Sequence, residues 1–169
     1  MMSAGGSEEA SSQGALGFDD DGGYRAAFDR ALRLLGQREH SQRELKDKLQ
    51  RKGVDRALAD LVVDDLRGRG LQSDARYAEA LVRSRVQRGH GPVRIRQELR
   101  QRGVDDVVAD EVLTTTDAHW LAQAGEVRSR KFGAEAPADR DDWNRQARFL
   151  AQRGYPADLI YRVLDGRGD

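Results

Sequence analysis

Arginines are concentrated in one stretch of the sequence, from Arg83 to Val104. This stretch contains seven arginines and a single acid, Glu98, although the whole chain has a formal net charge of zero. A guanidinium group donates parallel hydrogen bonds to phosphate or carboxylate and keeps its charge at physiological pH. The stretch therefore predicts a site for a polyanion or for an acidic protein surface. Its expected members are Arg83, Arg85, Arg88, Arg94, Arg96, Arg100 and Arg102.

A short helix is needed to hold these side chains. Pro92 suits a first helical turn, where no backbone N–H is required, and Gly103 suits the left-handed residue that ends a helix. Ile95 and Leu99 are four residues apart, so they share one helical face. We expect that face to be buried. The arginines at 96, 100 and 102 should then point away from it.

The same pattern occurs 50 residues earlier, which indicates an internal repeat. In that earlier copy Ser41 is placed to cap a helix, and Glu44 is placed to reach back as the second half of a capping box. The matching positions are His40 and His90, Leu45 and Ile95, Leu49 and Leu99, Gly53-Val54-Asp55 and Gly103-Val104-Asp105, Ala59-Asp60 and Ala109-Asp110, and Val62 and Val112. A third, fainter copy includes Leu150, Gly154 and Leu164. The earlier copy would extend the basic face with Lys46, Lys48, Arg51 and Lys52.

No segment alternates polar and apolar residues over several positions, so we predict an all-α protein. The expected architecture is an elongated tandem array of three three-helix repeats, each resembling a helix-turn-helix unit and leaning on its neighbours to bury its apolar face. The predicted divisions are a disordered acidic arm at 1–22 and repeats at 23–72, 73–116 and 117–169. The arm is expected to be disordered because it is rich in Ser, Gly and acids. Asp74 is expected to cap the first helix of the second repeat.

Composition excludes several classes of function. The chain has no cysteine, so disulfides, thiolate nucleophiles and Cys-based zinc sites are ruled out, and a reducing cytosol is compatible with it. The first residues lack the basic and apolar segments of a secretory signal, and no run approaches a membrane span. We expect a cytoplasmic protein that does not contact membranes.

Other sites of chemistry find little support. Two of the three histidines, His40 and His90, precede equivalent helices, which helix capping explains better than metal binding. No Ser-His-Asp arrangement, nucleotide-binding glycine loop or metal-binding acid constellation is recognisable. We therefore expect no catalytic, cofactor or metal site. The aromatic residues, Tyr77 and Trp120 among them, are expected to pack in the core.

At the level of whole motifs the sequence resembles the RecX regulatory family of bacteria. The resemblance rests on the segments 38–53, 70–85, 89–99, 148–155 and 159–164, and it extends from about Tyr24 to Leu164. It departs from the family pattern at Gln72-Ser73, where RecX proteins have an apolar residue followed by an acid or amide.

The resemblance implies a tandem three-helix fold and a partner, the RecA recombinase. RecX-like proteins bind RecA and its filaments on single-stranded DNA. They inhibit strand exchange, ATP hydrolysis and coprotease activity, which modulates recombination, DNA repair and the SOS response. The resemblance thus implies a non-enzymatic regulator, expected to act as a monomer, whose basic face pairs with DNA phosphate or with acidic RecA surface.

Two alternatives remain open from the residues alone. The helix-turn-helix resemblance allows a stand-alone DNA-binding protein that reads duplex sequence, although the candidate recognition face contains Gln97 and Gln101 as its only base-reading amides. A nuclease is the other alternative, which an assay with magnesium would test.

Overall fold

The computed structural model describes residues 21–114 and 117–166. Within these ranges the chain forms nine α-helices and no strand, which confirms the all-α prediction. The helices are α1 (Asp21–Gln37), α2 (Gln42–Arg51), α3 (Arg56–Gly68), α4 (Asp74–Gln87), α5 (Pro92–Gln101), α6 (Asp106–Thr114), α7 (Asp117–Phe132), α8 (Arg140–Arg153) and α9 (Ala157–Leu164).

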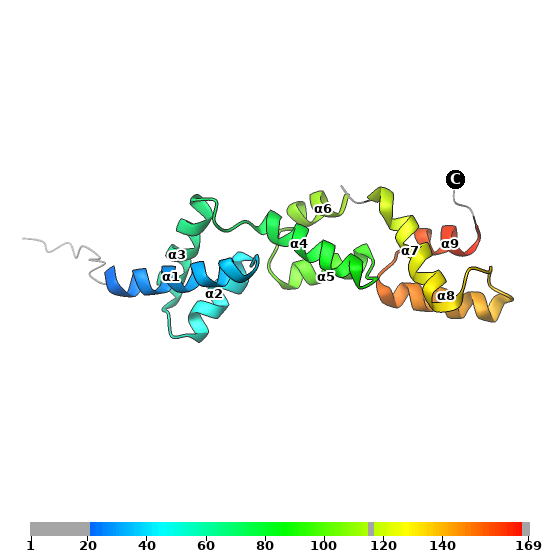
Figure 1. The fold of residues 1–169 in the computed structure, drawn as a ribbon, viewed down its shortest axis with the longest axis horizontal. Coiled ribbons are helices and arrows are strands. Elements are labelled where there is room, and N and C mark those ends of the chain that lie inside the picture. The colour runs from blue at the N-terminus through cyan, green and yellow to red at the C-terminus, as the bar shows by residue number, and fades with distance from the viewer. Residues whose placement is uncertain (1–20, 115–116, 167–169) are drawn as a thin grey trace, which may run out of the picture.

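The helices group into three successive units, here called repeat 1 (α1–α3), repeat 2 (α4–α6) and repeat 3 (α7–α9). Each helix packs mainly against the other helices of its own repeat. Figure 1 shows the three repeats in sequence order along the long axis of the molecule. The predicted elongated array of three-helix repeats is therefore confirmed.

The acidic arm predicted for residues 1–22 lies almost entirely outside the described residues. Its last two residues, Asp21 and Gly22, belong instead to the first turn of α1.

The chain has two hydrophobic cores rather than one continuous core. Repeat 1 has its own core, centred on Leu45, Leu49 and Leu66, which are fully buried. A second core runs through repeats 2 and 3, and its buried members extend from Tyr77 to Leu164. Repeats 2 and 3 thus rely on each other as expected, whereas repeat 1 buries its apolar face mainly by itself.

Several helix ends follow the sequence signals closely. Ser41 caps α2 by accepting a hydrogen bond from the backbone N–H of Glu44, and Asp55 caps α3 in the same way through Ala57. Gly53 and Gly103 follow the equivalent helices with φ of 87° and 78°, in the left-handed region that favours glycine. The middle helices of repeats 1 and 2 therefore have the same local design.

Two expected caps differ from the structure. The N-cap of α4 is Ser73, and Asp74 lies one residue inside the helix. The Asp74 carboxylate instead accepts hydrogen bonds from the backbone N–H of Gln42 at 2.9 Å and from Nε2 of Gln72 at 2.9 Å. The capping box at Ser41 is likewise only half formed, because the Glu44 carboxylate binds arginines and not the Ser41 backbone.

Successive repeats meet at a recurring joint, where the beginning of one middle helix contacts the end of the next. Between repeats 1 and 2, the Ser41 hydroxyl donates to the backbone oxygen of Arg102 at 2.8 Å. Between repeats 2 and 3, the N–H of Gly91 donates to the Arg153 oxygen at 2.7 Å, and the N–H of Val93 to the Gly154 oxygen at 3.0 Å. The first joint thus uses a side-chain donor at this position, whereas the second has direct hydrogen bonds between backbones.

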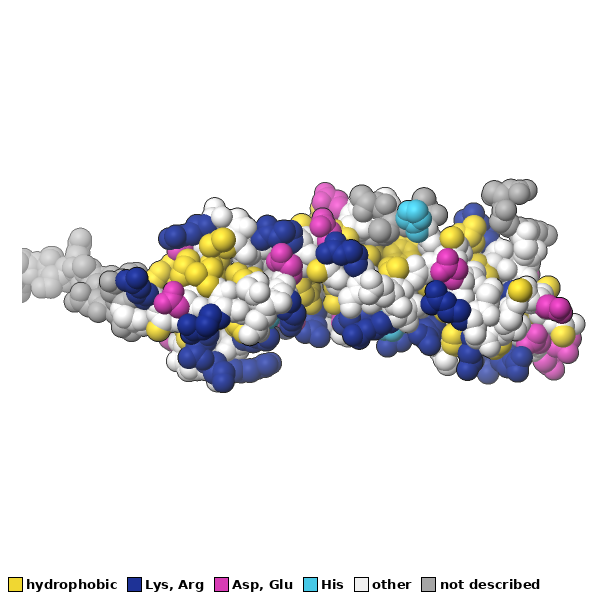
Figure 2. Space-filling model, in the orientation of Figure 1, with side chains coloured by type: hydrophobic (Ala, Val, Ile, Leu, Met, Phe, Trp, Pro, Cys, Tyr) yellow, Lys and Arg dark blue, Asp and Glu magenta, His cyan; other side chains and the backbone are white. Residues whose placement is uncertain are grey.

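Repeat 3 differs at the beginning of its middle helix. Asp139 caps α8 by accepting from the N–H of Asp142 at 2.8 Å, and Asp142 accepts from the N–H of Ala138 at 3.0 Å. Figure 2 shows Asp and Glu side chains gathered at the end of the molecule where α8 begins. The start of this helix is therefore capped by carboxylates of its own repeat.

Candidate anion-binding face

The helix α5 presents its arginines as the sequence predicts. Ile95 and Leu99 are fully buried, while Arg94 and Arg100 are exposed. Pro92 occupies the first helical position after the N-cap Gly91. Figure 2 shows Lys and Arg side chains along the lower edge of the array in all three repeats.

Four of the seven arginines are paired with acids, most of which come from other helices. Arg85 binds Glu98 through two hydrogen bonds of 2.5 and 2.8 Å. The other three pairs are Arg96 with Asp110, Arg100 with Asp106, and Arg102 with Glu44. Within the described residues, Arg83, Arg88 and Arg94 have no ion-pair partner. The uncompensated charge is therefore smaller than the arginine count suggests.

One ion pair recurs in successive repeats. Lys46 pairs with Asp60 at 3.1 Å in repeat 1, and Arg96 pairs with Asp110 at the equivalent positions of repeat 2. Both pairs tie a middle helix to the third helix of its repeat, which indicates a structural role.

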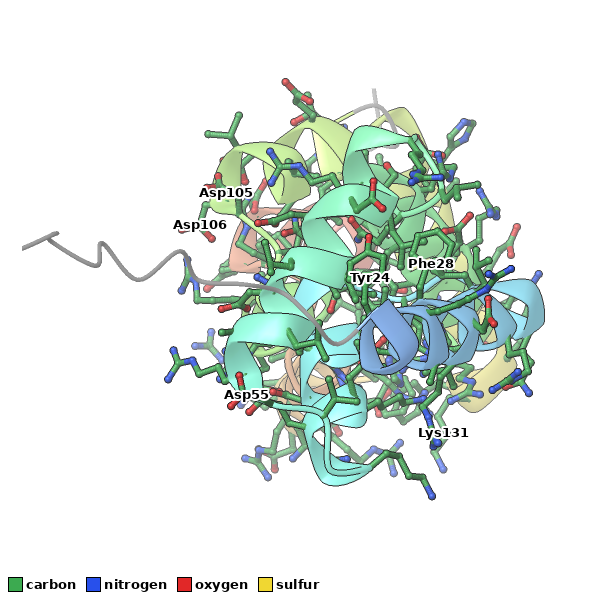
Figure 3. The ribbon with its side chains drawn as sticks, turned by 90° about the vertical axis from the view of Figure 1, so that its left-hand side faces the viewer. Tyr24, Phe28, Asp55, Asp105, Asp106 and Lys131 are labelled. Carbon is green, nitrogen blue, oxygen red and sulfur yellow. The ribbon has the colours of Figure 1, made fainter. Side chains whose placement is uncertain are left out.

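Figure 3, viewed along the array, shows Asp55, Asp105 and Asp106, at or near the beginnings of α3 and α6, on the side opposite Lys131. These three acids thus lie away from the side on which Lys131 projects.

Three neighbouring hollows line the basic face. The joint hollow, about 470 Å³, lies between repeats 1 and 2; the α5 hollow is about 440 Å³ and the α2 hollow about 290 Å³. Arg102 lines all three, so the hollows adjoin one another around this side chain. The cations that line at least one hollow are Arg38, Arg43, Lys48, Arg51, Arg85, Arg88, Arg94 and Arg102.

The structure thus brings together only part of the predicted set. Arg85, Arg88, Arg94, Arg102, Lys48 and Arg51 line the hollows. The remaining predicted members, Arg83, Arg96, Arg100, Lys46 and Lys52, line none of the three. Sequence reasoning missed Arg38 and Arg43. The internal repeat could have predicted Arg38, because this residue lies 50 positions before Arg88 and occupies the equivalent position of repeat 1.

Glu44 and Glu98 neutralise part of this region. Burial alone would raise the pKa of Glu44, but the hydrogen bond from Arg38 and the charges of Arg38 and Arg102 outweigh it, and its pKa is lowered. The hydrogen bonds from Arg85 lower the pKa of Glu98. Both carboxylates are consequently ionised at neutral pH and hold their arginines in fixed positions.

His40 is a structural residue of the joint. Its Nδ1 lies 2.9 Å from the backbone oxygen of Arg38, and its Nε2 lies 3.1 Å from Nζ of Lys48. Burial lowers the pKa of His40, so the neutral ring donates to the oxygen and accepts from the lysine. Among the described residues, no group of three or more His, Asp or Glu side chains is arranged to hold a metal ion.

Three family models match the chain one after another. They describe the first, second and third three-helix domains of RecX and match residues 27–66, 73–113 and 118–164. The chain belongs to the RecX family of regulatory proteins.

Curated RecX relatives match most of the chain. The regulatory protein RecX of Halorhodospira halophila is 56% identical over 135 residues, covering 80% of this chain and 84% of the relative. That of Pseudomonas syringae pv. tomato is 43% identical over 138 residues, covering 82% and 89%. The fold is also that of a crystal structure of RecX from Lactobacillus salivarius, with a TM-score of 0.75 at 21% identity, covering 86% of this chain and 96% of that one.

Gln72 and Ser73, at the beginning of repeat 2, both have structural roles. Gln72 is almost fully buried, and its Nε2 donates to the backbone oxygen of His40 at 3.2 Å and to Asp74. Ser73 caps α4. Gln72 thus links the beginning of repeat 2 to repeat 1, and Ser73 fixes the start of α4. None of the described helices combines the length and hydrophobicity that a bilayer crossing requires.

Proposed function

We propose that this protein binds the RecA recombinase, particularly its filament on single-stranded DNA, and inhibits strand exchange, ATP hydrolysis and coprotease activity. It would thereby modulate recombination, DNA repair and the SOS response in the cytoplasm, acting as a monomer and without catalysis of its own. Membership of the RecX family supports this assignment. The structural observation that carries it is the row of three repeats with cations along one edge.

The geometry suggests how such a protein would act. A RecA filament is a helical polymer, and an elongated array of similar units offers contacts at several points along it. Each contact can be weak, because linkage within one chain makes every further contact intramolecular and raises the overall affinity. Binding along the filament would then compete with the partner DNA for the same surface.

The hollows are proposed as the main electrostatic contact. Arg88, Arg94 and Arg51 line them without ion-pair partners in the described part of the chain, so their charge is available to a ligand. Arg85 and Arg102 are held by Glu98 and Glu44, and we propose that they contribute mainly fixed positive potential. Lys46, Arg96 and Arg100 are proposed to act less directly, because each is paired outside the hollows.

A charge-reversal experiment tests this proposal. The variant Arg51→Glu, Arg88→Glu, Arg94→Glu should lose most of its inhibition of RecA ATPase and strand exchange while remaining helical by circular dichroism. The matched control is Arg33→Glu, Arg67→Glu, Arg162→Glu, which makes the same change in charge at exposed arginines that line none of the three hollows. Equal inhibition by both variants would show that the hollows are not the contact.

The same proteins distinguish a stand-alone DNA-binding function. That alternative requires tight, sequence-selective binding to duplex DNA without RecA. The pairing of Arg96 and Arg100 with acids of α6 disfavours it, because these side chains would be needed to reach base edges. A gel shift with random and selected duplexes, measured without RecA, should show no sequence preference.

A further inference from the structure

The joint hollow is built from both repeats that it separates. Repeat 1 contributes Arg38 and Glu44, α4 contributes Tyr77 and Ser84, and the end of α5 contributes Arg102. Its walls therefore come together only when repeats 1 and 2 are docked. The ion pair between Glu44 and Arg102, which links the two repeats, is part of its lining.

Tyr77 is one of the residues that line this hollow. The residue is only 4% exposed and belongs to the core of repeats 2 and 3, yet its hydroxyl has no hydrogen-bond partner among the described residues. This hydroxyl oxygen is not among the fully buried polar atoms that lack a partner, so it is accessible from the hollow that Tyr77 lines. Tyr155 is the counter-example in this chain, because its hydroxyl donates to the Gly89 oxygen at 3.2 Å. Burial raises the pKa of Tyr77, so its hydroxyl stays protonated and able to donate at neutral pH.

Two further donors line the same hollow. Arg88 has no ion-pair partner in the described part of the chain, although its backbone oxygen is fixed by a hydrogen bond from Arg153 at 3.0 Å. The Ser84 oxygen accepts from Nη1 of Arg85 at 3.2 Å, which leaves the Ser84 proton available for a ligand. Glu44 already occupies Arg38 and Arg102. The donors without an acceptor are thus one guanidinium and two hydroxyls.

We propose that the joint hollow binds one phosphodiester group of single-stranded DNA, with Tyr77, Ser84 and Arg88 as its hydrogen-bond donors. This deepens the proposed function and rests on it. Arginine, serine and tyrosine side chains are among the usual donors to backbone phosphate, and they read no sequence. A phosphate carries several acceptor oxygens on one centre, which suits donors of two chemical kinds on different parts of a recessed wall. The adjoining α5 hollow, which shares Arg88 and Arg102 and adds Arg94, offers a path for the next phosphate.

The consequence is that DNA binding and repeat docking are coupled. A phosphate in the joint hollow would contact groups of repeat 2 beside the Glu44 pair that links the two repeats. The added anion would be balanced by Arg88, and Glu44 would keep its arginines. The DNA strand would therefore bind across a preformed joint and not replace it.

The test measures binding of a fluorescein-labelled oligothymidylate to the full chain by fluorescence anisotropy, without RecA. Tyr77→Phe removes only the hydroxyl from a packed ring, so it should fold normally and weaken binding about tenfold, the loss typical of a hydrogen bond to a charged group. Arg88→Gln should weaken binding and reduce the slope of log affinity against log salt by about one. Tyr161→Phe and Arg67→Gln are matched controls at exposed positions outside the hollow and should bind as the unmodified protein does.

The outcomes separate this proposal from the proposed function. If Tyr77→Phe binds the oligonucleotide with unchanged affinity and melts at the same temperature as the unmodified protein, the phosphate site is refuted. If the variants bind DNA normally but no longer inhibit RecA, the hollow instead accepts a carboxylate of a protein partner, which also refutes it. If the unmodified protein binds DNA through Tyr77 but fails to inhibit RecA, the site stands and the proposed function fails.

Discussion

Glu44 of repeat 1 accepts a 2.6 Å hydrogen bond from Nη1 of Arg102 in repeat 2, while Nη1 of Arg38 binds its other oxygen at 3.1 Å. The carboxylate is nearly buried, with a side chain only 9% exposed, and it connects two repeats whose cores are separate. It is therefore one of the few groups on which the docking of repeat 1 depends.

Replacing Glu44 should loosen this joint. Glu44→Gln keeps the shape but removes the charge that two arginines share, and we expect a loss of about 1–2 kcal/mol in the free energy of unfolding, as for hydrogen bonds to charged groups. Urea denaturation would measure it. The control Glu126→Gln removes an exposed pair with Arg130 and should cost less than about 0.5 kcal/mol. A similar loss in both variants would contradict a special role for Glu44.

Acidification should destabilise the protein in two stages. Burial lowers the pKa of His40 and His90 in the folded chain below the ordinary value of 6.5, so the unfolded chain binds protons first as the pH falls. Their contribution is complete above pH 6.5 and is lost below it. Glu44 and Glu98, whose pKa values are lowered from 4.5, then lose their contribution as the pH falls below that value.

Thermal melts from about pH 8 down to about pH 3, in roughly half-unit steps, would follow both stages, because the second stage begins only below the ordinary Glu pKa. The variant His119→Asn changes an exposed histidine and should leave the curve unchanged. His40→Asn should flatten its upper part. A curve of the unmodified protein that is flat from pH 7 to pH 5 would argue against the buried, neutral state of His40.

Adding a methyl group at Gly91 should separate repeats 2 and 3. A Cβ there would lie 2.5 Å from the backbone carbon and oxygen of Gly154, which cannot move aside as a flexible side chain would. Gly91→Ala should therefore destabilise the protein by about 1–3 kcal/mol. Gly125→Ala is the matched control, because a Cβ within α7 meets nothing within 4 Å and should be neutral or stabilise by up to about 1 kcal/mol. Differential scanning calorimetry would show whether each variant melts at a lower or a higher temperature than the unmodified protein.

The separate core of repeat 1 predicts that the array does not unfold as one unit. In native-state hydrogen exchange, α2 and α3 should lose protection at a lower free energy than α5 and α8. Leu49→Ala, which opens the repeat 1 core, should cost about 2–5 kcal/mol and affect protection in repeat 1 alone. Leu99→Ala should reduce protection in repeats 2 and 3 together. An equal loss of hydrogen-exchange protection in all three repeats, in either variant, would show that the two cores are coupled.

Most of the fold could be predicted from local sequence signals at the ends of the helices. Ser41, Gly53, Pro92 and Gly103 act through their own backbone or their nearest turn, so their positions in the sequence are sufficient to place helix ends. Asp74 was misplaced by one residue because Ser73 beside it is also a good cap, and because its carboxylate is used by a different repeat.

The candidate site was harder to predict because charge partners are set by packing between distant helices. Nothing near Arg96 indicates Asp110, and nothing near Arg102 indicates Glu44, which lies 58 residues away. A count of arginines therefore overestimates the free charge. The internal repeat could have corrected part of this, since it relates Arg38 to Arg88 and Lys46 to Arg96.

The carboxylates at the start of α8 also bear on self-association. At both internal joints the start of a middle helix supplies a donor to the carbonyl end of the next one. The start of α8 carries the carboxylates of Asp139 and Asp142 where α2 has the Ser41 hydroxyl, and an ionised carboxylate has no proton to donate to the carbonyl end of α2 in a second copy. The side-chain bond that joins repeats 1 and 2 within one molecule therefore has no equivalent between the end of one molecule and the beginning of another.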